Sequence, residues 1–420
     1  MSGERASVET QADDRRQPCI GVCVSGGGFR AAFYAIGALR YIAEAGLLAA
    51  VTDISAVSGG SLAAAKLAAE WPPATDDPSG WLIHSVERPM REAVANNNIR
   101  NRWLGKVATG RSLGRGGRGA LLGELFCEIL ELPSELHELP VGPRTIFTST
   151  CLQTGRAFRF ARAFTGSWDF GYAEPTPAGV RLGLALAASA AFPQTFTVVQ
   201  MPTEPLGLPK EAPSTITLVD GGVYDNLGLE WFQGRGSTRP QGGADVEFVL
   251  VINASGALTP ATRKVGAGRA LMRDISVQYS QTLNVRVRWF VDRLLDAPGS
   301  GAYVGINRDP RRYTLADNVT PVPPEFYDGA LPSSLASRLA RVRTDLDRFT
   351  LEESSLLGYH GYWSLHARLA TFRPDLALTR PSWREFADLS ASEEGWLGAL
   401  LDDSARLRLR GRTSRFAPRA

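Results

Sequence analysis

Residues 19–61, CIGVCVSGGGFRAAFYAIGALRYIAEAGLLAAVTDISAVSGGS, contain two consecutive units of strand, glycine turn and helix. In the first unit, the apolar run CIGVCVS ends in three glycines, and apolar residues then recur at helical spacing. In the second unit, VTDISAVS is followed by a glycine pair and by the helical segment SLAAAKLAAEW. Two such units in succession are typical of an α/β fold with parallel strands. We therefore expect a layered α/β protein with a mostly parallel central sheet.

The composition is that of an ordinary globular protein, because 44% of the 420 residues are hydrophobic and 21% are charged. The net charge of +3 is too small to indicate a nucleic-acid partner, and we expect none. No cysteine and histidine cluster has zinc spacing, so we expect neither a metal ion nor another cofactor. The polar N-terminus lacks the apolar run of a secretion signal. We therefore expect a cytoplasmic protein.

Ser58 lies where the second strand turns into its helix, in the sequence Ala56-Val57-Ser58-Gly59-Gly60. Such a turn lifts a serine hydroxyl out of the sheet and places it at the start of a helix, where negative charge is stabilised. The usual nucleophile elbow reads G-x-S-x-G, and here Ala56 replaces the first glycine. Ser58 is therefore a candidate nucleophile, although the same sequence also fits an ordinary glycine turn.

The first glycine turn, Gly26-Gly27-Gly28, fits two kinds of site. It could hold a dinucleotide phosphate, but the G-x-G-x-x-G pattern is incomplete because Ala31 replaces its last glycine. Alternatively, its backbone N–H groups form an oxyanion hole, where each donor contributes roughly 3 kcal/mol to the transition state of acyl transfer. The neighbouring Arg30 then contacts a substrate phosphate or forms a structural ion pair.

A third glycine turn, Asp220-Gly221-Gly222, follows the apolar strand STITLV. The glycines let the chain turn away and leave the carboxylate facing the end of the strand, although a D-G pair is also a common hairpin turn. Strand ends at one edge of a parallel sheet converge. We therefore expect Ser58, the glycine loop and Asp220 to meet.

In this order and at this spacing, SGGGFRA, VSGGS and VDGG resemble the motifs of the patatin-like phospholipase family. The glycine loop is similar to the variant found in group IV cytosolic phospholipases, and RTDLDRF and GYHGYW resemble a segment of bacterial members. TSTCLQTGRAFRF and AASAAFPQTF resemble a hairpin and a helix end of the same family. The resemblance covers residues 19–235 well and residues 260–372 more loosely.

The resemblance implies a patatin-like three-layer fold with a helical C-terminal extension, and a Ser–Asp dyad that works without histidine. It implies that Ser58 is the nucleophile, that Asp220 accepts its proton, and that Gly26, Gly27 and Gly28 form the oxyanion hole. The supporting positions are Gly60, Gly221 and Gly222, with Arg30 at the substrate phosphate.

The substrates that the resemblance implies are glycerophospholipid and acylglycerol esters. We therefore expect a serine lipid acyl hydrolase of the phospholipase A or lysophospholipase kind, acting in lipid catabolism. Its partners are then a phospholipid or another acyl-ester lipid and a peripheral membrane surface, and an activator of unknown identity is left open. The alternative on the same fold is a regulated membrane-degrading effector, either a toxin or an antiphage defence protein. A non-catalytic binding protein is less favoured, because every catalytic residue type is present.

Other residues have competing interpretations. His360 follows Ser58 and Asp220 in the chain order of an α/β-hydrolase triad, but it lies in a predicted helix and not at a strand end. The pair Asp225-Asn226 is expected to cap a turn and not to supply a second catalytic carboxylate. A basic loop that contains Trp103 either rests on a membrane or is solvated.

The chain divides into regions of different character. Residues 1–17 are charged and lack aromatic residues, which predicts disorder. Residues 18–235 are expected to form the catalytic core, residues 236–372 a mostly helical remainder of the same unit, and residues 373–420 a tail of uncertain structure. The further predicted elements are a mobile loop over 95–119, a hairpin over 144–161, and helices over 120–132, 261–295, 333–349 and 352–371.

Overall fold

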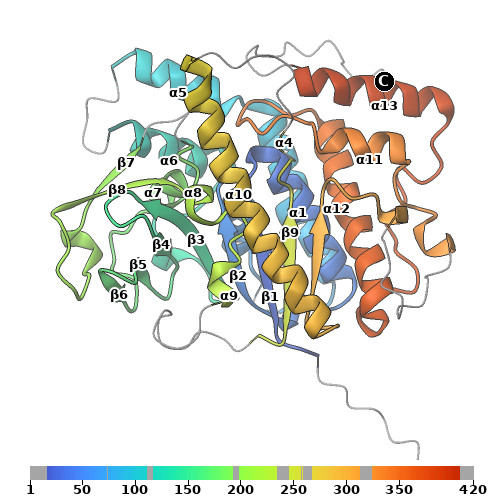
Figure 1. Cartoon of the computed structure of the whole chain (residues 1–420), viewed down its shortest axis with the longest axis horizontal. Helices are drawn as coiled ribbons and strands as arrows, with labels where there is room; N and C mark the ends of the chain where they lie inside the picture. The colour runs from blue at the N-terminus through green and yellow to red at the C-terminus, as the bar shows by residue number, and fades with distance from the viewer. Residues whose placement is uncertain are drawn as a thin grey trace, which may run out of the picture.

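A computed structural model of the chain shows a mixed β-sheet with helices on both faces (Figure 1). The structure describes residues 17–72, 74–110, 117–192, 198–233, 246–256, 258, 267–312 and 324–406, so most of the predicted disordered N-terminus lies outside it. The strands are β1 Ile20–Val24, β2 Val51–Val57, β3 Arg144–Cys151, β4 Ala157–Phe160, β5 Thr165–Ser167, β6 Gly171–Ala173, β7 Val199–Pro202, β8 Thr215–Asp220, β9 Phe248–Asn253 and β10 Gly301–Gly305.

The α-helices are α1 Gly28–Glu44, α2 Gly59–Ala69, α3 Pro78–Trp81, α4 Arg88–Asn96, α5 Ile99–Ala108, α6 Gly117–Leu130, α7 Leu182–Ser189, α8 Gly222–Asp225, α9 Glu230–Gln233, α10 Ala267–Asp296, α11 Ser333–Leu339, α12 Leu351–Phe372 and α13 Ala391–Arg406. None of these described helices combines the length and the apolar character needed to cross a membrane.

The sheet is ordered β10-β9-β1-β2-β3-β4-β5-β6, and the first five of these strands are parallel to one another. Side chains alternate between the two faces, as the period of a strand requires. On β1, Val22 and Val24 enter one hydrophobic cluster and Cys23 enters the other. The parallel part of the sheet is therefore buried on both faces. This confirms the predicted α/β class with a mostly parallel central sheet.

Strand β8 meets β2 end to end along the same side of β3. Val57, the last residue of β2, pairs with Thr148, and β3 then continues to Cys151. The antiparallel β8 pairs with these additional residues, so that Asp220 lies opposite Ser149. Because β4 occupies the other side of β3 over the same residues, the ends of β2 and β8 point toward each other.

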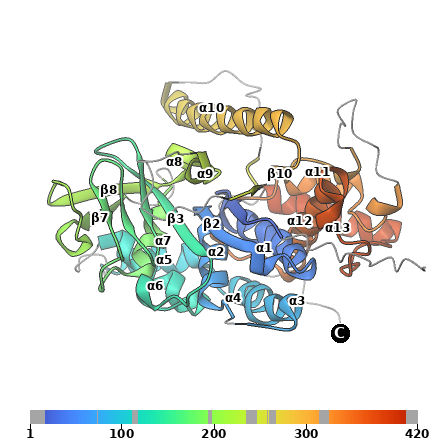
Figure 2. The same cartoon turned by 90° about the horizontal axis from the view of Figure 1, so that it is seen from below.

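Helices α1, α2 and α12 pack on one face of the sheet, and α8, α9 and α10 lie on the other. Figure 2 shows α10 separated from α1 and α2 by the sheet. Helices α1 and α12 cross in close contact, because a Cβ on Gly37 would lie only 1.7 Å from the carbonyl oxygen of Gly358. Since α1 begins at the glycine loop, this crossing connects the loop to the C-terminal part of the chain.

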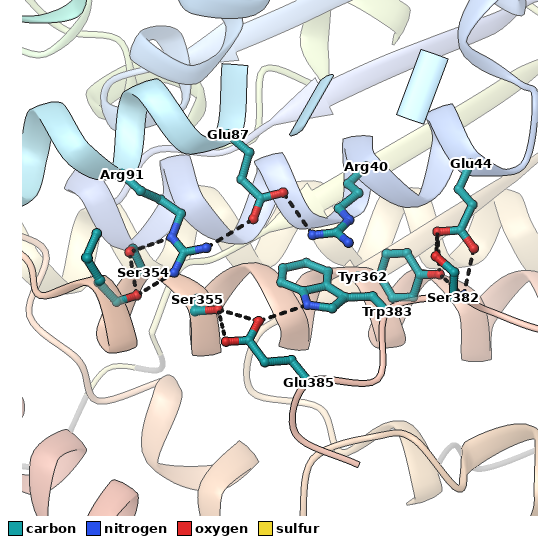
Figure 3. A network of polar contacts seen from close by, with 11 residues as sticks. Arg40, Glu44, Glu87, Arg91, Ser354, Ser355, Tyr362, Ser382, Trp383 and Glu385 are labelled. Atoms are coloured by element: carbon teal, nitrogen blue, oxygen red, sulfur yellow. Dashed lines mark hydrogen bonds and ion pairs between the residues drawn. The ribbon is translucent and has the colours of Figure 1, made fainter. Parts of the chain in front are cut away.

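The segment after α12 is fixed to α1 by polar and aromatic contacts (Figure 3). The Glu44 carboxylate accepts hydrogen bonds from the N–H and Oγ of Ser382, at 2.7 and 2.8 Å, and from the hydroxyl of Tyr362 at 2.8 Å. The Arg40 guanidinium lies 3.8 Å from the centre of the Trp383 ring. The first part of the predicted tail therefore packs on α1, the helix that begins at the glycine loop, and on α12.

Two predicted elements differ from the structure, and one strand has no counterpart among the predictions. Within the predicted loop over 95–119, residues 99–108 form α5, because Asn98 caps that helix and Ile99 and Trp103 give it a buried side. The helix predicted over 333–349 ends at Leu339, since the carbonyl groups that follow bind the start of α1. Strand β10 was not predicted, although GAYVG extends the sheet beside β9. The predicted hairpin, α10 and α12 are confirmed.

Candidate active site

Ser58 directly follows β2 and has a backbone conformation that residues other than glycine rarely adopt. Its φ is 52° and its ψ is −126°, and such a conformation costs about 1–3 kcal/mol. The Ser58 N–H donates a hydrogen bond of 3.0 Å to Oγ of Ser189 on α7, which itself donates to the carbonyl of Thr148 at 2.7 Å. The hydroxyl of Ser61 lies 2.9 Å from the same Oγ. These hydrogen bonds hold the sharp strand-to-helix turn that the sequence predicts.

The residues after Ser58 are glycines because two helix starts meet there. A Cβ on Gly59 would lie 2.0 Å from the carbonyl oxygen of Gly28, and one on Gly60 would lie 2.6 Å from that of Ser25. Contacts this short leave no room for a side chain. The start of α2 therefore packs directly on the glycine loop at the start of α1.

Asp220 ends β8 with its carboxylate buried beside Ser58. Its Oδ1 accepts a hydrogen bond of 2.7 Å from the Gly222 N–H, and the carboxylate is also hydrogen bonded to the Ser58 side chain. A Cβ on Gly221 would lie 2.1 Å from the carbonyl oxygen of Thr148, so the turn passes β3 too closely for any side chain. The two strand ends thus place a carboxylate against a serine hydroxyl.

The reason for this convergence differs from the expected one. Asp220 does not come from a neighbouring parallel strand, because β8 is antiparallel to β3 and approaches β2 from the opposite direction. The sequence motif gave no information on strand direction. The expected meeting of Ser58 and Asp220 is nevertheless found.

Burial raises the pKa of Asp220 from 3.8 to about 6, while the hydrogen bonds from Ser58 and Gly222 oppose this rise. A carboxylate is a better general base when its pKa approaches the working pH, as long as it remains ionised there. At neutral pH, Asp220 is ionised and can accept the Ser58 proton directly.

The glycine loop lies against Ser58 and carries free donors. The Gly26 N–H donates to the carbonyl of Asn226 at 3.0 Å, and Gly27 and Gly28 have φ values of 140° and 57°. Among the residues that the structure describes, neither the N–H of Gly27 nor that of Gly28 has a hydrogen-bond partner. The loop leads into the 17-residue helix α1, whose N-terminal dipole favours negative charge.

Arg30 is buried, with only 5% of its surface exposed. Its Nη1 donates hydrogen bonds to the carbonyl oxygens of Ala340 and Val342, at 2.9 and 2.8 Å. These carbonyls belong to the segment between α11 and α12. The placement favours the structural alternative over the phosphate contact, because Arg30 joins this segment to the start of α1.

His360 has the contacts of a core histidine. Its Nε2 lies 3.0 Å from the carbonyl oxygen of Ile306, and its ring packs on Tyr34 of α1 with the ring centres 5.6 Å apart. Burial lowers the pKa of His360 to about 4, so it is neutral at physiological pH. These contacts give no support to the Ser–Asp–His alternative.

Asn226 and Ser189, which lie near the site, were not identified as functional residues from the sequence. Asp225 accepts hydrogen bonds of 3.0 and 2.7 Å from backbone N–H groups two and five residues later, which confirms its predicted role as a cap. Its neighbour Asn226 instead holds Gly26 through its carbonyl. Ser189, which supports the nucleophile turn, lies in the AASAAFPQTF segment, where only a helix end was expected.

Trp103 does not face a membrane. It is 5% exposed, and its indole N–H donates to the carbonyl of Arg118 at 2.9 Å. The Arg118 side chain is exposed, while residues 111–116 lie outside the described residues.

A comparison with protein-family models identifies a family for this chain. The family model for patatin-like phospholipase matches residues 22–231, half of the chain. The search of curated proteins finds no match.

Several solved structures are more distantly similar. Human GIVD cytosolic phospholipase A2 is 13% identical with a TM-score of 0.47, covering 93% of this chain and 63% of that one. The same enzyme in complex with methyl gamma-linolenyl fluorophosphonate inhibitor and terbium chloride is 14% identical with a TM-score of 0.46, covering 93% and 60%. VipD from Legionella pneumophila is 12% identical with a TM-score of 0.31, covering 92% and 75%. The chain spans less than two thirds of the length of these phospholipase A2 chains. The family match over half of its sequence shows that the chain belongs to the patatin-like phospholipase family.

Proposed function

We propose that this protein is a serine lipid acyl hydrolase of the phospholipase A or lysophospholipase kind, with Ser58 and Asp220 as a catalytic dyad. The observation that carries the proposal is the buried Asp220 carboxylate, hydrogen bonded to the Ser58 side chain at the start of α2. Family membership supports a lipid ester as the substrate. The adjoining glycine loop supports acyl transfer, because its donors lie beside the nucleophile.

In the first half of the reaction, Asp220 takes the hydroxyl proton of Ser58 as Oγ attacks the ester carbonyl carbon. The N–H groups of Gly27 and Gly28 stabilise the oxyanion, with Gly26 shaping the loop, and each donor contributes roughly 3 kcal/mol. The proton then passes from Asp220 to the alcohol oxygen as the C–O bond breaks, leaving an acyl-serine. In the second half, Asp220 takes a proton from water, whose oxygen attacks the acyl group. Ser58 leaves with that proton, and a fatty acid is released.

Peripheral contact with a membrane is part of the proposal, because a lipid ester must partly leave the bilayer to reach the site. The exposed Arg118 lies in the basic segment after α5. Anionic lipid attracts a basic residue near its surface by about 1 kcal/mol. Changing Arg111, Arg115 and Arg118 to glutamine should therefore weaken binding to anionic vesicles at low salt. Unchanged binding would place the contact elsewhere.

The proposal is tested with purified protein and mixed phospholipid vesicles, analysed by mass spectrometry for free fatty acid and lysolipid. We expect release by the wild-type protein, no release by Ser58→Ala, and labelling of Ser58 by a fluorophosphonate probe. Labelling that survives in Ser58→Ala would identify a different nucleophile. Activity that appears only after a cell extract is added would favour the regulated effector.

A further inference from the structure

Asn226 joins the glycine loop to helix α10. Its carbonyl accepts a hydrogen bond of 3.0 Å from the Gly26 N–H. Its side-chain Nδ2 donates to Oγ of Ser255 after β9 at 2.7 Å, and its Oδ1 accepts from the hydroxyl of Tyr279 on α10 at 2.5 Å. Asn226 is buried, so its polar groups depend on these protein partners.

The Tyr279 hydroxyl and the Asn226 amide fill the space between the two glycine turns of the site. A Cβ on Gly26 would lie 2.2 Å from the Asn226 Oδ1. A Cβ on Gly222 would lie 1.8 Å from the Tyr279 hydroxyl and 2.6 Å from the same Oδ1. The Gly222 N–H donates to Asp220. Tyr279 and Asn226 therefore contact both the glycine loop and the turn that holds the Asp220 carboxylate.

A second interaction, on the same side of helix α10 as Tyr279, also holds this helix beside Asn226. Arg286 follows Tyr279 by seven residues, about two helical turns, and its Nε lies 3.1 Å from Oδ1 of Asp225. The Tyr279 ring packs edge-on against Phe192, with the ring centres 6.1 Å apart. Figure 2 shows α10 beside α8, on the opposite side of the sheet from α1 and α2. Two side chains at helical spacing thus bind the adjacent residues Asp225 and Asn226.

We propose that Tyr279 is a positioning residue of the acyl-transfer site. Its hydroxyl fixes the Asn226 side chain, and Asn226 holds the glycine loop where the oxyanion of the Ser58 adduct must be bound. The inference rests on the proposed function. Tyr279 acts through Asn226 and does not need to touch the substrate. Without the phenolic O–H, the buried Oδ1 loses a donor, and the amide is no longer held in one orientation.

The effect of Tyr279 should fall on kcat and not on KM. Oxyanion donors bind the transition state more strongly than the ground state, so a displaced glycine loop slows turnover without weakening substrate binding. A purely structural role would instead lower the melting temperature and the amount of active protein, while each active molecule kept its kcat.

The test compares Tyr279→Phe with the wild-type protein on a soluble short-chain ester. The variant keeps the ring that packs on Phe192 and removes only the hydroxyl. We expect kcat to fall roughly three- to tenfold, the range expected for one hydrogen bond, with KM and the fraction of active sites unchanged. The matched control is Gln278→Ala, the neighbouring exposed residue of α10, which should keep the wild-type kcat. A Tyr279→Phe kcat equal to that of the control would overturn the inference.

A double variant tests whether Tyr279 works through Asn226. If it does, Tyr279→Phe combined with Asn226→Ala is no slower than Asn226→Ala alone, and losses that multiply would contradict the relay. If Asn226→Ala does not fold, the rate of fluorophosphonate labelling of Ser58 in Tyr279→Phe decides, because the phosphonyl oxygen needs the same donors. A slower rate supports the inference and an unchanged rate overturns it.

The failure of this inference is distinguishable from failure of the proposed function. Wild-type protein that neither turns over an ester nor labels at Ser58 would overturn both. An active wild-type enzyme with a fully active Tyr279→Phe variant would overturn only the role of Tyr279.

Discussion

Asp220 and Ser149 lie opposite each other in the antiparallel pair of β8 and β3. The residue before Ser149, Thr148, pairs with Val57, which immediately precedes Ser58. Strand β3 therefore sets the register of both residues of the proposed dyad. Because side chains alternate along a strand, a slip of β8 by one residue would turn Asp220 to the other face of the sheet.

Replacing Ser58 by alanine or by glycine should abolish turnover equally but change stability differently. An alanine at this position is strained by the positive φ of 52°, whereas a glycine adopts it without strain. We expect Ser58→Gly to be more stable than Ser58→Ala by about 1 kcal/mol, after the greater freedom of glycine in the unfolded chain is counted. Urea unfolding measures the difference. Equal stabilities would show that the turn is not strained.

The buried Asp220 should make activity rise and stability fall with increasing pH. Only the ionised carboxylate accepts the serine proton, so kcat should increase as the pH passes through about 6. The pKa is raised above its ordinary 3.8, so the folded protein binds the proton more tightly than the unfolded chain. The stabilisation from the protonated group is present in acid and is lost between pH 3.8 and about 6.

Asp220→Asn should therefore lose nearly all turnover and be more stable than the wild-type protein at neutral pH. The gain is at most about 3 kcal/mol, reduced by any weakening of the hydrogen bond from Gly222. Unfolding in urea at neutral pH and in mild acid checks the sign, because the gain should shrink as the wild-type carboxylate is protonated. A gain that is constant across this range would argue against a raised pKa.

His360→Gln should fold and remain active. His360 bonds to the carbonyl of Ile306 in the core, so we expect a loss of stability on the order of 1–2 kcal/mol and a kcat within a few-fold of the wild type. As a triad member it would lower kcat by roughly 10⁴ or more. A folded but inactive variant, with folding checked by thermal melting, would reject the dyad.

Gly59→Ala should inactivate the enzyme because the added methyl group would lie 2.0 Å from the Gly28 carbonyl oxygen. The glycine loop must then move away from Ser58, and a displacement of about 1 Å can cost 100-fold in rate. Gly105→Ala in α5 is the control, since nothing lies within 4 Å of its added methyl. We expect the control to keep full kcat on a soluble ester. Full activity in Gly59→Ala would mean that the loop and the nucleophile turn are not in contact.

Arg30→Met distinguishes a structural arginine from one that binds a substrate phosphate. Removing the donors to Ala340 and Val342 should reduce stability by about 1–3 kcal/mol. In the structural role, kcat/KM should fall in parallel for a phospholipid and for a neutral acylglycerol. A loss of kcat/KM for the phospholipid alone would instead support a contact between Arg30 and the substrate phosphate.

The parts of the fold that follow from short-range patterns could be predicted from the sequence. Strand, glycine turn and helix recur within a few residues, and the residues of the proposed dyad lie at such turns. Even the departure at Ala56 has a local explanation: this residue is fully buried within β2, before the turn begins, so its methyl group fits.

The residues that could not be predicted act over long distances in the chain. Ser189 lies 131 residues from Ser58, to which it is hydrogen bonded, and Tyr279 lies 53 residues from Asn226. Helix α5 was missed because it lies in a stretch rich in glycine, arginine and asparagine with little apolar periodicity. Strand β10 was missed because its short run GAYVG is indistinguishable from a loop until β9 lies beside it. Such contacts are set by tertiary packing, which leaves no periodic pattern in either partner.

The place of β1 in the sheet also has a consequence for biosynthesis. Although β1 is the first strand made, it lies between β2 and β9, and the loop that follows it is held by carbonyl groups up to Asp345. A ribosome adds about 5–20 residues per second, so Ser58 and Asp220 exist for roughly 6–25 seconds before residue 345 is joined to the chain. Strand β1 lacks its neighbour β9 until residue 253 has been added, and the start of α1 lacks the Asp345 carbonyl until the end of that time. We therefore expect the growing polypeptide to spare the membranes of the cell that makes it, and hydrolysis to begin only after translation has passed this segment.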